Sequence, residues 1–254
     1  MRFVIITGCD RSGTTFLANL LSHAPDIEAR HEFFGTSAAL NPSQPGRTFT
    51  ALAYYAPGHP YLERTLRHEK DQVLARFPDR HAFVDVNGRL RYALDVARRV
   101  LDEPACFQLV RNGRDVVRSF YLSKRYSERD RGSMAILPSD PATLELWEGY
   151  SRFERISWYW NHVVSRLLEQ GIDVLHLERI VSDYQYLREH LLEPCGIGLD
   201  LDAWRSVKDK RLHRTRFRLK YMLRGQPVGM KWTPELETRF TAICGATMSA
   251  LGYE

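Results

Sequence analysis

The opening of the chain constrains its fold more than any other feature, because a short apolar run leads directly into a glycine-rich loop. Residues 3–6 (FVII) are continuously apolar, which is typical of a parallel strand covered on both faces. The loop GCDRSGTT follows at 8–15, and apolar residues then repeat with helical spacing over 16–21. This order predicts a P-loop-like unit, in which backbone N–H groups at a helix N-terminus bind an anion.

The rest of the sequence alternates between strand and helix patterns. Further strands are predicted at 26–34, 82–84, 105–110 and 172–177, and helices at 90–101, 115–124, 144–169 and from Thr233 onward. Such alternation predicts a three-layer α/β/α fold with a central parallel sheet. Since neither a linker nor an internal repeat is visible, residues 1–254 are predicted to form a single domain with irregular insertions at about 35–80 and 122–145.

Composition points to a globular protein. Hydrophobic residues make up 44% of the 254, and no stretch approaches the ~18 consecutive apolar residues of a membrane span. The first residues read as a strand and not as a signal peptide. The four cysteines form neither a CxxC pair nor a metal-ligand pattern, which favours reduced thiols. We therefore expect a cytoplasmic protein without a membrane span or a metal site.

The glycine-rich loop lacks the lysine of nucleoside-triphosphate loops. In those loops a lysine follows the second glycine and reaches the β- and γ-phosphates. Here Thr14 holds that position, and Arg11 supplies the positive charge from inside the loop. This difference argues against an ATP-dependent kinase, which stays open as an alternative.

A second basic motif follows the predicted strand at 105–110. Arg111 comes at the carboxyl end of that strand, the edge at which open α/β sheets bind ligands. Ser119 lies eight residues later on the following helix, so both side chains can meet one phosphate. Together the two motifs predict an elongated ligand that is anionic at two points, such as a nucleotide with a separate ribose phosphate.

These motifs resemble the sulfotransferase family, whose members use 3′-phosphoadenosine 5′-phosphosulfate (PAPS). RSGTTFLANLL at 11–21 and LVRNGRDVVRSFY at 109–121 carry the resemblance, and FVDVNGRLRY at 83–92 extends it. The ending at 231–253 is similar to that of bacterial members. The resemblance implies metal-independent transfer of a sulfuryl group to a hydroxyl or amine of a carbohydrate, glycolipid or small metabolite. It also implies release of 3′,5′-adenosine bisphosphate (PAP) and no nucleic-acid partner.

The resemblance also assigns binding residues. It implies that the 5′-phosphosulfate is held by the loop residues Arg11, Ser12, Gly13, Thr14 and Thr15. Arg111 and Ser119 match the pair that holds the 3′-phosphate. Phe16 either lies near the adenine or belongs to the helix core, and Arg224-Gly225 resemble a loop that closes over the 3′-phosphate. In one departure from the family, His176-Leu177-Glu178 stand where relatives commonly have Arg-Tyr-Glu.

The acceptor must lose a proton, and the segment His31-Glu32-Phe33-Phe34 offers the base. In βαβ topology the end of the second strand returns beside the loop, and similar Glu-Phe-Phe stretches in carbohydrate-type relatives carry a glutamate base. We predict Glu32 as the base, with His31 second and Glu28 third, and Arg11 as the group that stabilises the departing charge. The alternative for Glu32 is a helix cap or an ion-pair partner.

One segment supports a different function. Residues 205–231 contain ten Lys and Arg against one acid, Asp209, and such a surface attracts polyanions. A non-enzymatic nucleic-acid binder is therefore the second alternative, although it leaves the glycine-rich loop without a role.

Overall fold

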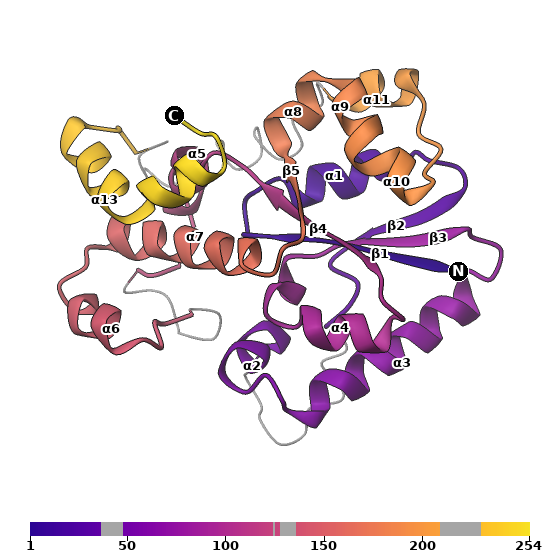
Figure 1. The fold of residues 1–254 in the computed structure, drawn as a ribbon, viewed down its shortest axis with the longest axis horizontal. Helices are drawn as coiled ribbons and strands as arrows, with labels where there is room; N and C mark the ends of the chain where they lie inside the picture. The colour runs from indigo at the N-terminus through magenta and orange to yellow at the C-terminus, as the bar shows by residue number, and fades with distance from the viewer. Residues whose placement is uncertain (37–47, 124, 128–135, 209–229) are drawn as a thin grey trace, which may run out of the picture.

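The structure, a computed structural model, describes residues 1–36, 48–123, 125–127, 136–208 and 230–254 (Figure 1). Its centre is a five-stranded sheet in the order β2-β3-β1-β4-β5, with every neighbouring pair parallel. The strands are β1 Arg2–Gly8, β2 Ile27–His31, β3 Ala82–Val86, β4 Ala105–Val110 and β5 Asp173–His176. This sheet confirms the predicted parallel α/β class.

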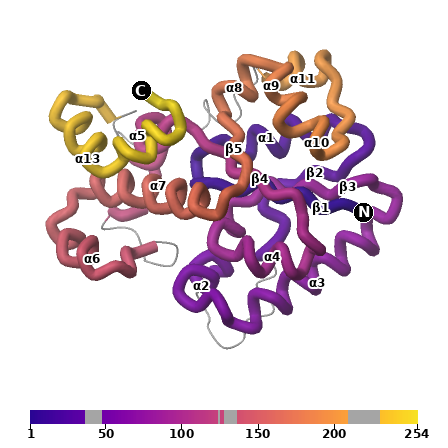
Figure 2. Tube along the Cα trace, in the orientation of Figure 1, coloured from indigo at the N-terminus to yellow at the C-terminus, as the bar shows by residue number. Residues whose placement is uncertain are grey.

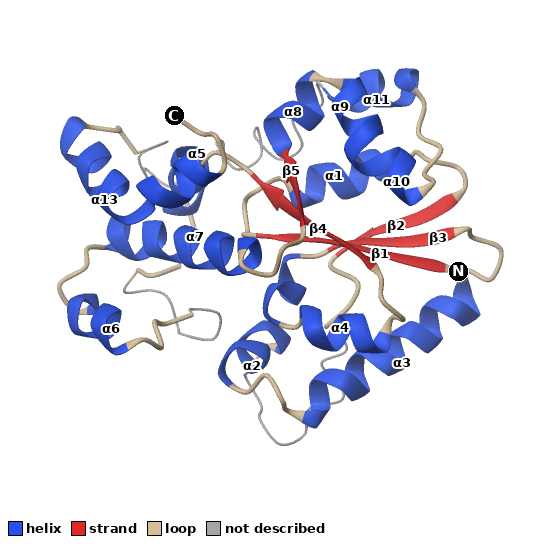
Figure 3. Cartoon of the chain, in the orientation of Figure 1, coloured by secondary structure: helices blue, strands red, loops and turns tan. Residues whose placement is uncertain are grey.

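Helices cover both faces of the sheet, which completes the three layers (Figure 3). One layer contains α1 Thr14–Leu21, α8 Leu177–Ser182, α9 Tyr184–Leu187, a π-helical turn η3 Arg188–Leu192, α10 Glu193–Cys195 and α11 Leu201–Lys208. The other side holds α2 Phe49–Tyr55, α3 Pro60–Arg76, η2 Gly88–Tyr92, α4 Leu94–Val100, α5 Gly113–Tyr121, α6 Pro141–Trp147, α7 Arg152–Leu168 and α13 Pro234–Ala250. The C-terminal helix α13 lies against α7 (Figure 2).

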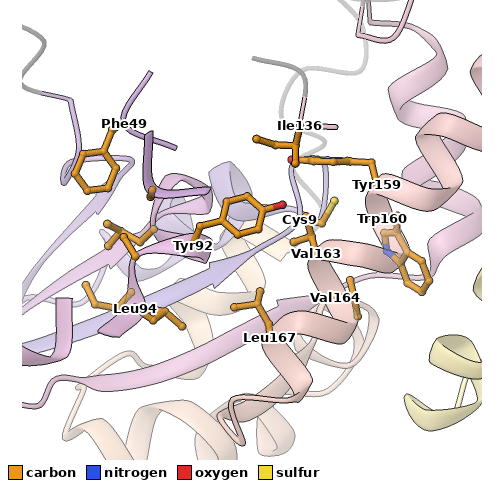
Figure 4. Close-up of a cluster of buried hydrophobic side chains, with 14 of the residues drawn as sticks. Cys9, Phe49, Tyr92, Leu94, Ile136, Tyr159, Trp160, Val163, Val164 and Leu167 are labelled. Atoms are coloured by element: carbon orange, nitrogen blue, oxygen red, sulfur yellow. The ribbon is translucent and has the colours of Figure 1, made fainter. Parts of the chain in front are cut away.

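Successive side chains of β1 point to opposite faces of the sheet and so belong to two separate core clusters. Phe3 and Ile5 belong to the cluster under α4 and α7, whereas Val4 and Ile6 belong to the cluster under α1 and the α8–α11 region. All four side chains are at most 4% exposed. Figure 4 shows part of the first cluster, in which Cys9 from the glycine-rich loop lies among apolar side chains of α7. Burial on both faces explains why the strand reads as one apolar run.

Two helical regions differ from the sequence-based prediction. The long helix predicted at 144–169 is divided into α6 and α7, because Ser151 starts a new helix with a capping box to Glu154. The segment 35–80, expected to be irregular, is helical over α2 and α3. The apolar periodicity of α3 is weak because its buried face includes the polar residues Thr65 and Glu69. Thr233 caps α13 and Pro234 opens it, as predicted.

The topology places a switch point between β1 and β4, which are direct neighbours. The chain leaving β1 enters α1 on one face of the sheet, and the chain leaving β4 enters α5 on the other face. A crevice for ligands forms where two such connections diverge. The glycine-rich loop and Arg111 therefore meet at the carboxyl edge of the sheet.

One carboxylate ties the glycine-rich loop to the rest of the fold. Oδ2 of Asp10 accepts hydrogen bonds from Arg125 at 2.6 Å, from the Tyr159 hydroxyl at 2.8 Å and from Arg91 at 3.3 Å. These partners come from three elements, and the Arg91 side chain is only 4% exposed. Burial acts to raise the pKa of Asp10, but the two guanidinium groups and the tyrosine outweigh it and hold the pKa well below its usual range.

The close packing behind Arg111 generates a prediction about stability. A Cβ added at Gly113, the first residue of α5, would lie 2.9 Å from Phe240 and 3.0 Å from Trp160, both fully buried. We expect Gly113→Ala to lower the free energy of unfolding by about 1–3 kcal/mol, because the rings cannot move without disturbing the core. Urea unfolding tests this. The control Gly149→Ala meets its nearest atom at 3.5 Å and should stay within about 1 kcal/mol of wild type; equal effects would contradict the packing.

Loss of the Asp10 charge should destabilise the protein. Asp10→Asn leaves Arg91 and Arg125 without a counter-charge, so we expect a loss of about 3 kcal/mol at pH 7 in urea unfolding. Since the pKa of Asp10 is lowered in the fold, its contribution is complete above its ordinary pKa of about 4 and disappears as the pH falls below that value. The difference between wild type and variant should therefore narrow below about pH 4. The exposed Asp202→Asn is the control, and a loss no larger than in that variant would refute the role of Asp10.

Candidate functional site

The glycine-rich loop makes a tight turn before α1. Arg11 has φ 72° and Gly13 has φ 96°, so two of three consecutive residues adopt left-handed backbone conformations. A Cβ at Gly13 would also lie 2.7 Å from the Leu177 side chain. Glycine is therefore required at position 13, whereas Arg11 is strained, as residues at functional sites often are.

The start of α1 is suited to an anion. Within the described residues, no side chain caps this helix. Its first-turn backbone N–H groups therefore lack the acceptor that a capping side chain would supply. Ser12 Oγ is fully buried and has no hydrogen-bond partner in the described part of the chain. Orphaned donors and a buried hydroxyl fit a bound phosphate or sulfate oxygen. The loop residues 11–15 thus fit the 5′-phosphosulfate that the sequence resemblance implies.

The second predicted anion site lies in direct contact with the first. Nε of Arg11 donates to Ser119 Oγ at 3.0 Å. Nη1 of Arg111 lies 3.5 Å from the Arg11 carbonyl oxygen, and Nη2 lies 3.4 Å from a carboxylate oxygen of Asp115. Arg11 is therefore brought together with Arg111 and Ser119, which lie 100 and 108 positions later in the sequence, at the β1–β4 switch point.

A hydrogen-bonded clamp supports the turn that carries Arg111. Glu178 accepts from the backbone N–H of Asn112 at 2.9 Å and from the Tyr253 hydroxyl at 2.8 Å. The same hydroxyl is 3.3 Å from Nδ1 of His176. Burial, together with the neighbouring Glu178 charge, raises the pKa of Tyr253, which keeps this phenol protonated. Sequence analysis did not identify Tyr253, which lies far along the chain from the 176–178 segment.

His31 contacts the loop hydroxyls. Its Nε2 lies 3.0 Å from Thr14 Oγ1 and 3.3 Å from Thr15 Oγ1. The end of β2 therefore returns beside the loop, as the βαβ argument predicted. Glu28 lies three residues earlier, pairs with Arg30 within the strand and is not brought to this edge.

Glu32 follows His31, and its side chain pairs with Arg89. Its backbone has φ 54°, another left-handed conformation at a non-glycine residue. One carboxylate oxygen accepts from both Nε and Nη2 of Arg89 at 3.0 Å. The side chains of Glu32 and Arg89 are 26% and 34% exposed, so this is a partly buried ion pair. The ion-pair alternative for Glu32 is thus realised, and the pair lies at the carboxyl edge of the sheet.

Sequence reasoning missed the residues that support the loop. Arg89 and Arg91 follow β3 directly, and two arginines after a buried strand are a usable signal for an anion site. The partnership of Asp10 with Arg125 and Tyr159 has no local signal, because these residues lie on different elements.

Two further predictions concern Phe16 and the segment that contains Arg224 and Gly225. Phe16 is partly buried and packs against the core beneath α1. Arg224, Gly225 and most of the basic segment 205–231 lie outside the described residues.

Two features are absent from the residues that the structure describes. In the described ranges, no helix combines the length and the apolar character needed to cross a bilayer. The same ranges contain no group of three or more His, Cys, Asp or Glu side chains arranged to hold a metal ion.

Comparison with known proteins identifies this fold. The sequence matches no family model and no curated protein. Among solved structures, the chain is similar over its full length to a sulfotransferase domain from the curacin biosynthetic pathway, with TM-score 0.57, 13% identity and 99% of that domain covered. The sulfotransferase domain of the Synechococcus PCC 7002 olefin synthase gives 0.56, 13% and 94%. A sulfotransferase from Alicyclobacillus acidocaldarius gives 0.53, 16% and 96%.

These neighbours are all sulfotransferases, and the alignments span the whole chain. The identities are low, so the likeness concerns the arrangement of the backbone. The resemblance inferred from the two motifs is confirmed at that level: the chain has the three-layer α/β/α fold of the sulfotransferases.

Proposed function

We propose that this protein transfers a sulfuryl group from PAPS to a hydroxyl or amine group of a small acceptor. The observation that carries the proposal is the contact between Arg11 and Ser119, which brings the two proposed anion sites next to each other. A single nucleotide charged at both its 5′ and 3′ positions matches that arrangement, whereas a ligand with one phosphate chain leaves Arg111 unused. The fold shared with sulfotransferases supports the same reading.

The loop residues stabilise negative charge. PAPS, when bound, supplies a sulfuryl group attached to a phosphate leaving group. In this proposal the Arg11 guanidinium and the first-turn N–H groups of α1 stabilise the charge on that phosphate, and each well-placed donor is worth roughly 3–4 kcal/mol in such a site. His31 holds the Thr14 and Thr15 hydroxyls in place through its Nε2. Asp10 does not repel the donor, because two guanidinium groups surround its carboxylate.

Glu32 removes the proton from the acceptor in this proposal. Its carboxylate is partly exposed, lies at the carboxyl edge of the sheet and is oriented by Arg89. His31 is less suited to the role, since its Nε2 already contacts two threonine hydroxyls. A positioned general base typically contributes about 10²–10⁴-fold to the rate.

We propose a carbohydrate-type acceptor because the Glu32-Phe33-Phe34 stretch resembles that of carbohydrate-type relatives. The aromatic cluster beside η2 does not line that site, since Tyr92 and Trp158 are 6% and 7% exposed and pack in the core. Tyr54 lies 4.9 Å from Tyr92 and 5.5 Å from His162 between ring centroids, and His162 stacks on Trp158 at 4.8 Å. Burial lowers the pKa of His162 to about 4, so its ring is neutral at physiological pH. Carbohydrates, glycolipids and small metabolites are the acceptor classes that we propose.

The wider proposal is a metal-independent cytoplasmic enzyme formed by one domain, with no nucleic-acid partner. An ATP-dependent kinase is disfavoured because Thr14 occupies the position of the phosphate-binding lysine and contacts His31 instead. The nucleic-acid alternative depends on the basic segment 205–231, of which only the two ends are described.

Nucleotide titration tests the donor. We expect PAP to bind more tightly than AMP or ATP in calorimetry, because only PAP occupies both anion sites. Arg111→Ala should weaken PAP about 10–100-fold, the effect of losing a charged hydrogen-bonding partner, and should leave AMP nearly unchanged. Arg67→Ala, an exposed arginine paired with Glu63, is the matched control. Tight binding of ATP with magnesium, unaffected by Arg111→Ala, would favour the kinase instead.

Substitution of the proposed base tests the chemistry. Glu32→Gln should lower turnover at least about 100-fold with an acceptor found in a panel of sugar and phenol hydroxyls. Its PAP affinity should stay within twofold, because the side chain contacts Arg89 and not the loop. Glu28→Gln, on the strand β2 that precedes Glu32, should be fully active. If Glu32→Gln turns over normally, Glu32 is not the base and His31 takes its place.

A further inference from the structure

The segment after Glu32 is held by two buried carboxylates. Asp85, at the end of β3, accepts the backbone N–H groups of Phe33 and Phe34 at 2.9 Å each, one on each oxygen. Glu69 of α3 accepts the next two N–H groups, from Gly35 at 2.7 Å and from Thr36 at 3.0 Å. Asp85 is fully buried and Glu69 is 1% exposed. Four consecutive backbone donors therefore end on side-chain carboxylates.

These bonds continue to Arg89 through Asn87. Nδ2 of Asn87 donates to Asp85 Oδ2 and to the Phe34 carbonyl, both at 2.7 Å. Oδ1 of Asn87 accepts the backbone N–H of Arg89 at 2.8 Å and so caps η2. The Arg89 side chain then donates to Glu32. The bonds form a closed circuit in which both ends of the Glu32–Arg89 ion pair are fixed by Asp85 and Asn87.

The ionised form of Asp85 is the one that this circuit uses. Burial raises the pKa of Asp85 to about 7, the bonds from Phe33, Phe34 and Asn87 lower it, and the nearby Glu69 raises it. All three contacts to Asp85 are donors, so a protonated carboxyl would find among them no acceptor for its O–H. Burying a carboxylate is unfavourable unless it is fully hydrogen-bonded, and the three bonds supply that compensation.

We infer that Asp85 is a positioning residue for the Glu32 base, acting through the loop 33–36 and through Asn87 and Arg89. The inference rests on the proposed function, because it assigns Glu32 a role in proton removal. Glu32 has a left-handed backbone that an isolated chain disfavours, and the bonds to Phe33 and Phe34 hold the residues that follow it. Asp85 itself does not touch the reacting atoms in this account.

A double-mutant cycle tests the inference in the full chain. Asp85→Asn keeps the shape but loses one acceptor, so we expect kcat to fall at least tenfold while the KM for PAPS and the PAP affinity stay within twofold. In the Glu32→Gln background the same change should alter the residual kcat less than twofold, because the group that it positions is gone. Asp95→Asn, an exposed carboxylate on α4, is the control and should match wild type.

Arg89→Lys gives a second test of the same inference. Because the Arg89 side chain is partly exposed, we expect this variant to fold. It should also lower kcat in the wild-type background and not in Glu32→Gln. Hydrogen exchange of unmodified protein gives a second measurement, in which the Phe33 and Phe34 amides should exchange at least 100-fold more slowly than in an unstructured peptide.

Three results would overturn the inference: multiplicative losses from Asp85→Asn and Glu32→Gln, a fully active Glu32→Gln, or unprotected amides at Phe33 and Phe34. Failure of the proposed function itself has a different signature, namely loss of the PAP preference over AMP and ATP in wild-type protein. The two failures can therefore be told apart.

Discussion

The position of the anion-binding loop depends on the carboxylate of Asp10. Arg91 follows β3, Arg125 follows α5 and Tyr159 belongs to α7, yet all three meet on one oxygen of this side chain. The loop is thereby fixed to elements from both sides of β1. An acidic residue inside an anion site is unfavourable by itself, but two guanidinium groups leave the cluster with a net positive charge. The same contacts therefore anchor the loop and make its surroundings favourable for an anion.

The two residues to which we assign chemistry are among the five described non-glycine residues with a left-handed backbone. Arg11 and Glu32 both adopt left-handed conformations, and each is held by contacts from outside its own segment. Arg11 is bonded to Ser119 of α5, and Glu32 to Arg89 of η2. Strain of this kind persists only where the surrounding structure compensates for it. The carboxyl edge of the sheet therefore holds one strained residue inside the loop and a second at the end of β2, which we assign to the donor and to the acceptor respectively.

Elements whose structure depends on neighbouring residues in the chain could be predicted from the sequence. The strand at 105–110 was predicted with its observed bounds, because every residue in it except Gln108 is apolar. The return of His31 to the loop followed from parallel topology, whereas the joint binding of one phosphate by Arg111 and Ser119 stays a prediction. The break before Ser151 was missed because apolar spacing continues across it, although the Ser-x-x-Glu capping box was present in the sequence. The Asp10 cluster and the Asp85 circuit depend on contacts between distant elements, which a single sequence does not encode locally.

The central claim is that one nucleotide occupies both anion sites at the β1–β4 switch point. A crystal structure of the protein with PAP tests it most directly. The account predicts the 5′-phosphate on the N–H groups of residues 11–15 and the 3′-phosphate on Arg111 and Ser119 of the same molecule. A PAP molecule with either phosphate away from these groups, or bound elsewhere on the protein, would contradict the claim.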